Sequence, residues 1–270
     1  MVKALISINV QLESSIALRY SKELSRRIDL RLQEVHVIES DRSGPTPGHG
    51  WVKQTWENAS IDTATKEIRQ FLSMENLDLK RLRDTEILIG DRTEKLLEKL
   101  LTRQYNLFIE GALPTFDTAD FYSRVRSRLY STMPCPALVV KNLVSLDKAA
   151  MLVDAGDTHS PVSGFLKIFG SSAIGIDAFV CKTGSSGNLE VKDAEDAPAW
   201  LDEAFRTADE QGVRPGIKAM LKGPAEAAAQ YLRAYGLVVA SLPRNPEANE
   251  PKLEILARAQ SPVLICWAEK

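Results

Sequence analysis

The sequence contains 270 residues, 44% of them hydrophobic and 26% charged, and it carries a formal net charge of −2. This length suits one large domain or two of modest size. The near-neutral charge excludes a global basic field that would attract nucleic acid or an anionic membrane. No window approaches the roughly 20 apolar residues that cross a bilayer, and the first ten residues are typical of a strand rather than a signal peptide.

The three cysteines, Cys135, Cys181 and Cys266, are widely spaced and lie in or beside apolar runs. An odd number of cysteines without a CxxC pair argues against a disulfide framework or a zinc site. Reduced thiols are typical of an intracellular protein. We therefore expect a soluble, cytoplasmic protein without a metal.

The first half of the chain alternates short β-branched apolar runs with stretches of helical period. Strands are expected at 4–8, 32–38, 85–89, 106–110 and 137–140, and helices at 14–28, 51–75 and 92–105. Such an alternation predicts parallel strands joined by right-handed crossovers, in an open α/β sheet with helices on both faces. Two polar stretches rich in Gly, Pro and Ser, 40–50 and 183–198, are expected to be surface loops, and a further helix is expected at 199–212.

The second half repeats the pattern of the first. Strands are expected at 149–156, 174–181 and 261–266, and the segment 217–243 parallels 85–114. The spacing between corresponding residues shrinks from 145 (Asn9 and Asp154) to 133 (Gly90 and Gly223) and 126 (Pro136 and Pro262). Duplication followed by loop deletions would leave this trend, and a repeat of this length indicates duplicated domains rather than solenoid units. We expect one domain over 1–143 and a second over 147–270.

Five stretches carry a resemblance to a known family. They are INVQLESSIAL (8–18), EVHVIES (34–40), IGDRTEKLLEKLLTRQYNLFIEG (89–111), MPCPALVV (133–140) and its counterpart AQSPVLIC (259–266). In this order, and duplicated, they resemble the universal stress protein (UspA-like) family in its tandem form. The resemblance implies two domains, each a five-stranded parallel sheet related to the adenine nucleotide α-hydrolases, and it implies that the two repeats pair.

The pairing also follows from a physical argument. Ala137–Val140 and the run from Val263 to Cys266 are apolar strands at the end of each repeat, where a strand tends to lie at a sheet edge. An unpaired apolar edge is an aggregation hazard. We therefore expect these two strands to cover each other in an internal pseudo-dimer.

Members of this family that bind ATP resemble one another in a signature after the fourth strand, which is Gly, two residues, Gly, nine residues, Gly, then Ser or Thr. Glycines let main-chain N–H groups approach phosphate oxygens. Here Gly111 fills the first place, Pro114 removes a donor at the second, and Arg124 and Val125 stand at the last two. In the second repeat, Ser241 replaces the first glycine, so neither repeat has the complete signature.

The end of the first strand is similarly divided between the repeats. ATP-binding relatives have an Asp there, followed by a small residue. The first repeat has Asn9 followed by Val10, whereas the second keeps Asp154 followed by Ala155 and Gly156. The candidate ligand-binding residues are therefore Asn9, Gly111, Arg124, Asp154 and Gly156.

Two groups of side chains allow alternatives. Arg124 and Arg128 would share one face of a continuous helix and meet an anion, or, as we favour, form a solvated face that balances Asp117 and Asp120. Asp154, Asp157 and His159 could bind a metal or take part in acid–base chemistry, but helix capping by Asp157 or Ser160 is the favoured interpretation because no further ligand stands at metal spacing.

No catalytic signature is present in the sequence: GxxxxGK[ST], GxSxG, HExxH and GxGxxG after the first strand are all absent. Our leading expectation is a non-enzymatic stress-response protein that binds a regulatory partner or a small ligand and uses no cofactor. The alternative is a divergent site for ATP or AMP with slow hydrolysis. A third possibility is an enzyme of the related hydrolase or adenylating kind, which only the expected fold supports.

Overall fold

A computed structural model describes most of the chain. The described residues are 1–39, 51–113, 118–154, 159–170, 172, 174–184, 187–193, 202, 205–206, 209–210, 213–247 and 250–268, with the side chains at 52, 159 and 183 excepted. The expected loop at 40–50 lies outside the described residues, as does most of the expected helix at 199–212.

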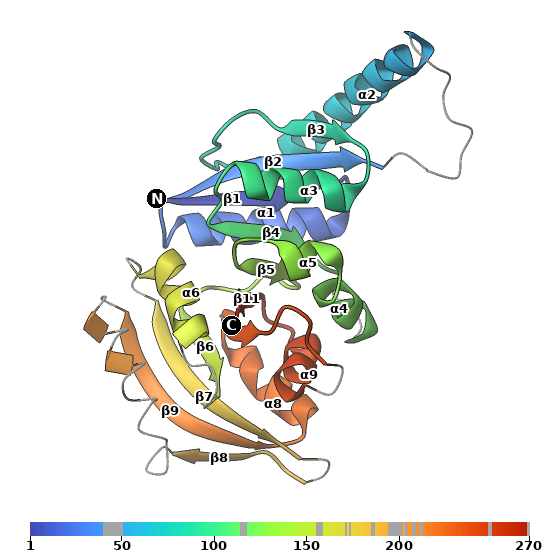
Figure 1. The fold of residues 1–270 in the computed structure, drawn as a ribbon. Helices are drawn as coiled ribbons and strands as arrows, with labels where there is room; N and C mark the ends of the chain where they lie inside the picture. Colours follow the sequence, from blue (N-terminus) through green and yellow to red (C-terminus); the bar gives the residue numbers. More distant parts are fainter. Residues whose placement is uncertain are drawn as a thin grey trace.

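The described chain forms a mixed α/β structure around one sheet (Figure 1). Its strands are β1 Val2–Ser7, β2 Leu30–Ile38, β3 Glu86–Ile89, β4 Leu107–Gly111, β5 Ala137–Val140, β6 Lys148–Val153, β7 Gly175–Thr183, β8 Glu190–Asp193, β9 Arg214–Gly223, β10 Leu237–Leu242 and β11 Val263–Trp267. Its helices are α1 Leu12–Ser25, α2 Trp51–Glu75, α3 Arg92–Thr102, α4 Thr118–Val125, α5 Arg128–Thr132, α6 His159–Phe169, α8 Ala225–Tyr231 and α9 Pro251–Arg258, with a 3₁₀ turn at Leu232–Ala234. The predicted α/β class is confirmed.

The strand order is the same in both halves of the sheet except that the second half has one additional outer strand, β8. The first half reads β3-β2-β1-β4-β5 and the second, from its outer strands inward, β8-β9-β7-β6-β10-β11. All pairs within the first half are parallel, and so are those from β9 to β11. β5 and β11 meet antiparallel at the centre, with Leu138 opposite Leu264. The domain limits at 143 and 147 stay a prediction; both positions lie between the end of β5 and the start of β6.

One strand was not expected. We predicted a loop over 183–198, but β8 lies in this stretch and pairs antiparallel with β9, with Val191 opposite Leu221. The prediction was wrong because Glu, Lys and Asp have low strand propensity, while the unpaired edge of β9 supplies main-chain partners that propensity does not reveal.

The helices divide between the two faces of the sheet, and each face has its own apolar core. One core contains side chains of α1, α2 and α6, and the other contains those of α3, α4, α5, α8 and α9. Both cores run across the central strands from one half to the other. The C-terminal part of α2 packs on the sheet through Ile68 and Phe71, whereas its N-terminal end extends beyond the sheet with Trp51 77% exposed (Figure 1).

Beside the central strands, a cationic side chain of each half binds main-chain carbonyl oxygens of the other half. The ammonium of Lys141, which follows β5, donates to the carbonyl oxygens of Leu256 and Ala259 at the end of α9, at 2.6 and 3.0 Å. Arg244, which follows β10, donates to the carbonyl oxygens of Tyr130 and Met133 around the end of α5, at 3.5 and 2.6 Å. The acceptors correspond between the halves: Tyr130 and Leu256 are 126 residues apart in the sequence, and so are Met133 and Ala259. Pro136 and Pro262 have the same spacing. Cations at helix C-termini satisfy the last carbonyls and the helix dipole, so each half caps a helix of the other.

Two glycines also mark the internal symmetry. Gly90, after β3, and Gly223, at the end of β9, have φ angles of +139° and +154°. Residues with a Cβ rarely adopt this region. The same backbone turn therefore follows corresponding strands in each half.

Candidate functional site

A cavity of about 880 Å³ opens at the carboxyl ends of β1, β2 and β4. Its walls come from these strands, the first turns of α1 and α3, and the segment from α4 to α5. In parallel α/β sheets this edge is where ligands gather, because loops rather than helices cover the strand ends. It is therefore the candidate functional site of the first half.

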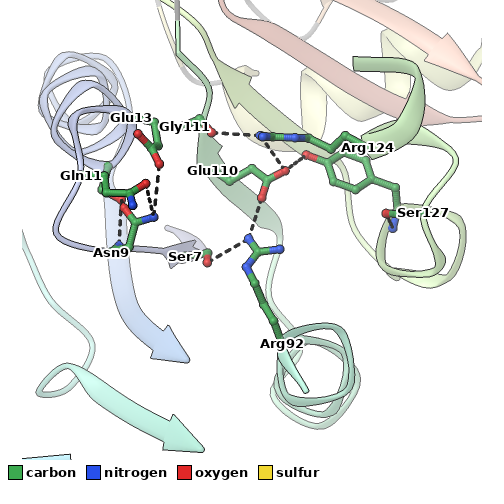
Figure 2. A network of polar contacts seen from close by, with 11 residues as sticks. Ser7, Asn9, Gln11, Glu13, Arg92, Glu110, Gly111, Arg124 and Ser127 are labelled. Carbon is green, nitrogen blue, oxygen red and sulfur yellow. Dashed lines mark hydrogen bonds and ion pairs between the residues drawn. The ribbon is translucent and has the colours of Figure 1, made fainter. Parts of the chain in front are cut away.

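A buried carboxylate occupies the centre of this site. Glu110 belongs to β4, a strand in which every residue is buried, and its side chain is 7% exposed. One carboxylate oxygen accepts from Arg92 Nη2 at 2.8 Å, and the other accepts from the Tyr130 hydroxyl at 2.5 Å and pairs with Arg124 Nη1 at 3.1 Å (Figure 2). Arg92 Nη2 also donates to Ser7 Oγ at 3.1 Å. We call Ser7, Arg92, Glu110, Arg124 and Tyr130 the Glu110 network.

Local structure places each cation of the network. Asp91 caps α3 by accepting from the main-chain N–H of Glu94 at 3.0 Å, so α3 begins at Arg92 and directs this residue toward the strand ends. Leu96 and Leu100 bury the other side of the helix against the sheet. Arg124 lies in the last turn of α4 and also donates to the carbonyl oxygen of Gly111 at 2.9 Å.

The charges in the network stabilise one another. Burial alone would raise the pKa of Glu110, but the guanidinium groups of Arg124 and Arg92 and the hydroxyl of Tyr130 outweigh it and hold that pKa below its ordinary value. Burial, and then the charge of Glu110, raise the pKa of Tyr130 well above its ordinary value. Glu110 is therefore an anion at neutral pH, and Tyr130 keeps the proton that it donates.

Gly111 does not present an open phosphate cradle. A Cβ on this residue would lie 1.9 Å from the main-chain oxygen of Glu13, so the first turn of α1 closes directly on the end of β4. The glycine is required by this close approach of two backbones. Its identity alone therefore says nothing of a bound phosphate.

Asn9 is engaged in the turn that leads into α1. Its side-chain oxygen accepts from Ser14 Oγ at 2.6 Å, and its Nδ2 donates to Gln11 and Glu13 at 3.3 and 3.2 Å. Its main-chain N–H donates to Ser14 Oγ at 2.8 Å. Asn9 lines the cavity, but its polar atoms serve the start of the helix.

The favoured interpretation of Arg124 was wrong. We expected a solvated face of one helix shared with Arg128, but α4 ends at Val125 and α5 begins at Arg128, so these residues lie on different helices. Arg124 forms an ion pair with the buried carboxylate of Glu110, and Asp117, one of its expected partners, lies outside the described residues.

The equivalent position in the second half holds a different pair. Asp154, at the end of β6, forms an ion pair with Lys252 of α9, with Oδ2 and Nζ 2.5 Å apart. Lys252 is buried and lies 3.4 Å from the hydroxyl of Ser241, the residue in place of the first glycine. Gly156 lies outside the described residues. The structure thus brings Asn9, Gly111 and Arg124 together around one cavity, while Asp154 belongs to the other half of the sheet.

Among the described residues, no group of three His, Cys, Asp or Glu side chains is placed to hold a metal ion. No helix in the described part of the chain is long and apolar enough to span a membrane.

Comparisons with known proteins identify the fold. No protein-family model matches the sequence, and no curated protein matches it. Among solved structures, a universal stress protein from Archaeoglobus fulgidus DSM 4304 superposes with a TM-score of 0.62 at 11% identity, over 99% of this chain and 97% of its own. The chain has the universal stress protein fold.

Two structures from Pseudomonas aeruginosa support the same fold. One, from strain UCBPP-PA14 and assigned to the universal stress proteins, has a TM-score of 0.55 at 17% identity and covers 98% of this chain and 93% of its own. The other, a functionally unknown protein from strain PAO1, has a TM-score of 0.56 at 18% identity and covers 98% and 92%. The universal stress protein fold therefore extends over nearly the whole chain.

Proposed function

We propose that the chain is a non-enzymatic binding protein of the universal stress protein kind, acting in the cytoplasm in a stress response without ATP. The observation that carries this proposal is the Glu110 network. It sets a buried anion beside Gly111, in the region where the family signature would place phosphate-binding amides.

The charge of the cavity wall argues against the binding of a nucleoside triphosphate. The cavity is lined by four carboxylates, Glu13, Glu39, Glu110 and Asp120, against two guanidinium groups. A triphosphate would meet an excess of negative charge, and the two guanidinium groups in the wall already neutralise Glu110. In the second half, Lys252 already neutralises Asp154, which relatives would direct at a nucleoside.

The arrangement of the halves supports a single binding unit. The antiparallel contact of β5 with β11 and the reciprocal cations Lys141 and Arg244 suit an internal pseudo-dimer of two repeats. Cys135, Cys181 and Cys266 form no disulfide, which suits a reducing, cytoplasmic location.

A second candidate is a divergent site for ATP or AMP. Two observations favour it, the size of the cavity, about 880 Å³, and the presence of Arg92 and Arg124 in its wall. Rearrangement of the Glu110 network could direct both arginines at a phosphate.

Thermal unfolding with Mg-ATP separates the two candidates. A ligand that binds only the folded state raises the melting temperature by mass action. We expect no shift at about 5 mM Mg-ATP, for the native protein and for the surface variant Glu98→Gln alike. A saturable shift that is lost in Arg92→Gln would contradict the proposal and support the nucleotide site.

A further inference from the structure

Two oppositely charged residues face the cavity with hydrogen-bonding capacity to spare. Arg92 donates only through Nη2, to Glu110 and Ser7; within the described part of the chain its Nε and Nη1 make no hydrogen bond. Glu13 accepts through Oε1 from Asn9, and among described residues its Oε2 accepts none. Both side chains line the cavity, and Figure 2 shows the second Nη of Arg92 pointing away from Ser7 and Glu110.

These two residues are not paired with each other. The ion pairs of the described residues include Arg92 with Glu110, but they include none for Glu13. The two residues come from separate elements, the first turns of α3 and α1, on either side of the end of β4. The cavity therefore offers a cationic and an anionic contact at different points of its wall.

The charges of the wall favour a ligand that carries both signs. A ligand that is only an anion would meet Glu13, Glu39 and Asp120, and a ligand that is only a cation would leave the spare donors of Arg92 unused. A molecule that carries both charges can satisfy both contacts at once. A planar carboxylate suits the donors of a guanidinium fork, and an ammonium supplies donors for a carboxylate.

We propose that this cavity binds a small zwitterion, whose carboxylate contacts Arg92 and whose ammonium contacts Glu13. The inference rests on the proposed function, since it names the class of ligand for the same cavity. Glu110 and Arg124 act as positioning residues: Glu110 fixes Arg92 from within the protein, and Arg124 holds Glu110 from the opposite side.

A series of unbranched ω-amino acids, from glycine to 6-aminohexanoate, tests the proposal as a molecular ruler. Calorimetric titration of the full chain should show saturable binding that is strongest at one length. That member should bind at least about tenfold more tightly than butyrate or butylamine, each of which makes only one of the two contacts.

Variants assign the two contacts. Glu13→Gln keeps the acceptor for Asn9 but removes the charge, and Arg92→Lys keeps the charge but removes the fork; each should weaken binding at least about tenfold. Glu98→Gln, on the exposed face of α3, is the matched control and should bind as the native protein does. Circular dichroism checks that each variant is folded, and Glu13→Gln decides the matter if Arg92→Lys is not.

Two outcomes would overturn the proposal. One is that no member of the series binds the native protein at about 10 mM; the other is that the best member binds Glu13→Gln with unchanged affinity. Mg-ATP is titrated in parallel, so that the two proposals fail separately. Nucleotide binding refutes the proposed function, whereas silence toward both ligand classes refutes the zwitterion alone.

Discussion

Replacing Glu110 with Gln removes the buried charge while keeping the shape of the side chain. Removing one partner of a buried ion pair typically costs about 3–5 kcal/mol, because the remaining charge loses its compensation. The side chains of Arg92 and Arg124 are 37% and 27% exposed in the folded protein, so water can solvate part of their charge in the variant. The Gln oxygen also remains as one acceptor. We therefore expect Glu110→Gln to lower the free energy of unfolding by about 2–3 kcal/mol near pH 7.

The pH dependence tests the electrostatic origin of this loss. The pKa of Glu110 is held below its ordinary value of 4.5 in the folded protein. A carboxylate with a lowered pKa in the folded state contributes stability that is fully present above 4.5 and is lost as the pH falls through the folded value. The difference between native protein and Glu110→Gln should therefore be constant from about pH 6 to 7 and shrink below 4.5.

Urea unfolding followed by circular dichroism measures both effects, provided that the slope with urea is unchanged. Glu98→Gln, whose side chain is 61% exposed, serves as the control and should stay within about 0.5 kcal/mol of the native protein. Equal unfolding midpoints for native protein and Glu110→Gln near pH 7 would refute the reasoning. So would a difference that persists unchanged at about pH 3.5.

Four other substitutions test the contacts around the network and between the halves, each by urea unfolding. Gly111→Ala should cost about 1–3 kcal/mol, because its Cβ would overlap a main-chain oxygen of α1; native-like stability would show that no close approach exists. Tyr130→Phe should cost about 1.5–3 kcal/mol through the lost hydrogen bond to the charged Glu110, and no loss would contradict that bond. Lys141→Met should cost about 2–4 kcal/mol and Arg244→Met about 1 kcal/mol, because the lysine is buried and serves three carbonyls; the reverse order would contradict this account of the caps.

The sequence allowed the fold to be predicted wherever local pattern and tertiary environment agree. β4, β5, β10 and β11 are buried throughout and are mainly apolar in sequence. α2 was expected over 51–75, the range in which it is observed. β8 escaped prediction because its strand conformation depends on pairing with β9 rather than on its own residues.

The candidate site was harder to predict than the fold. Asn9, Gly111 and Arg124 were proposed only as separate candidates, and their positions around one cavity depend on atoms contributed by distant segments. Gly111 looked like the remnant of a phosphate-binding signature, whereas the approach of α1 to β4 is sufficient to require it.

Glu110 and Arg92 were missed, although the sequence contained one usable signal. A carboxylate within the apolar run LFIEG is expected to be buried, and a buried carboxylate requires a cationic or hydrogen-bonding partner. Which of many arginines would supply that partner could not be read from the sequence. It depends on where α3 begins relative to the end of β4.

The central claim is that the Glu110 network prevents a nucleoside triphosphate from binding in the cavity. Native mass spectrometry after incubation with Mg-ATP tests this claim most directly. Under instrument conditions in which ATP-binding proteins retain one nucleotide, we predict that only the mass of the free chain is observed. A stoichiometric ATP adduct on the native protein, absent from a variant that lacks Arg92, would contradict it.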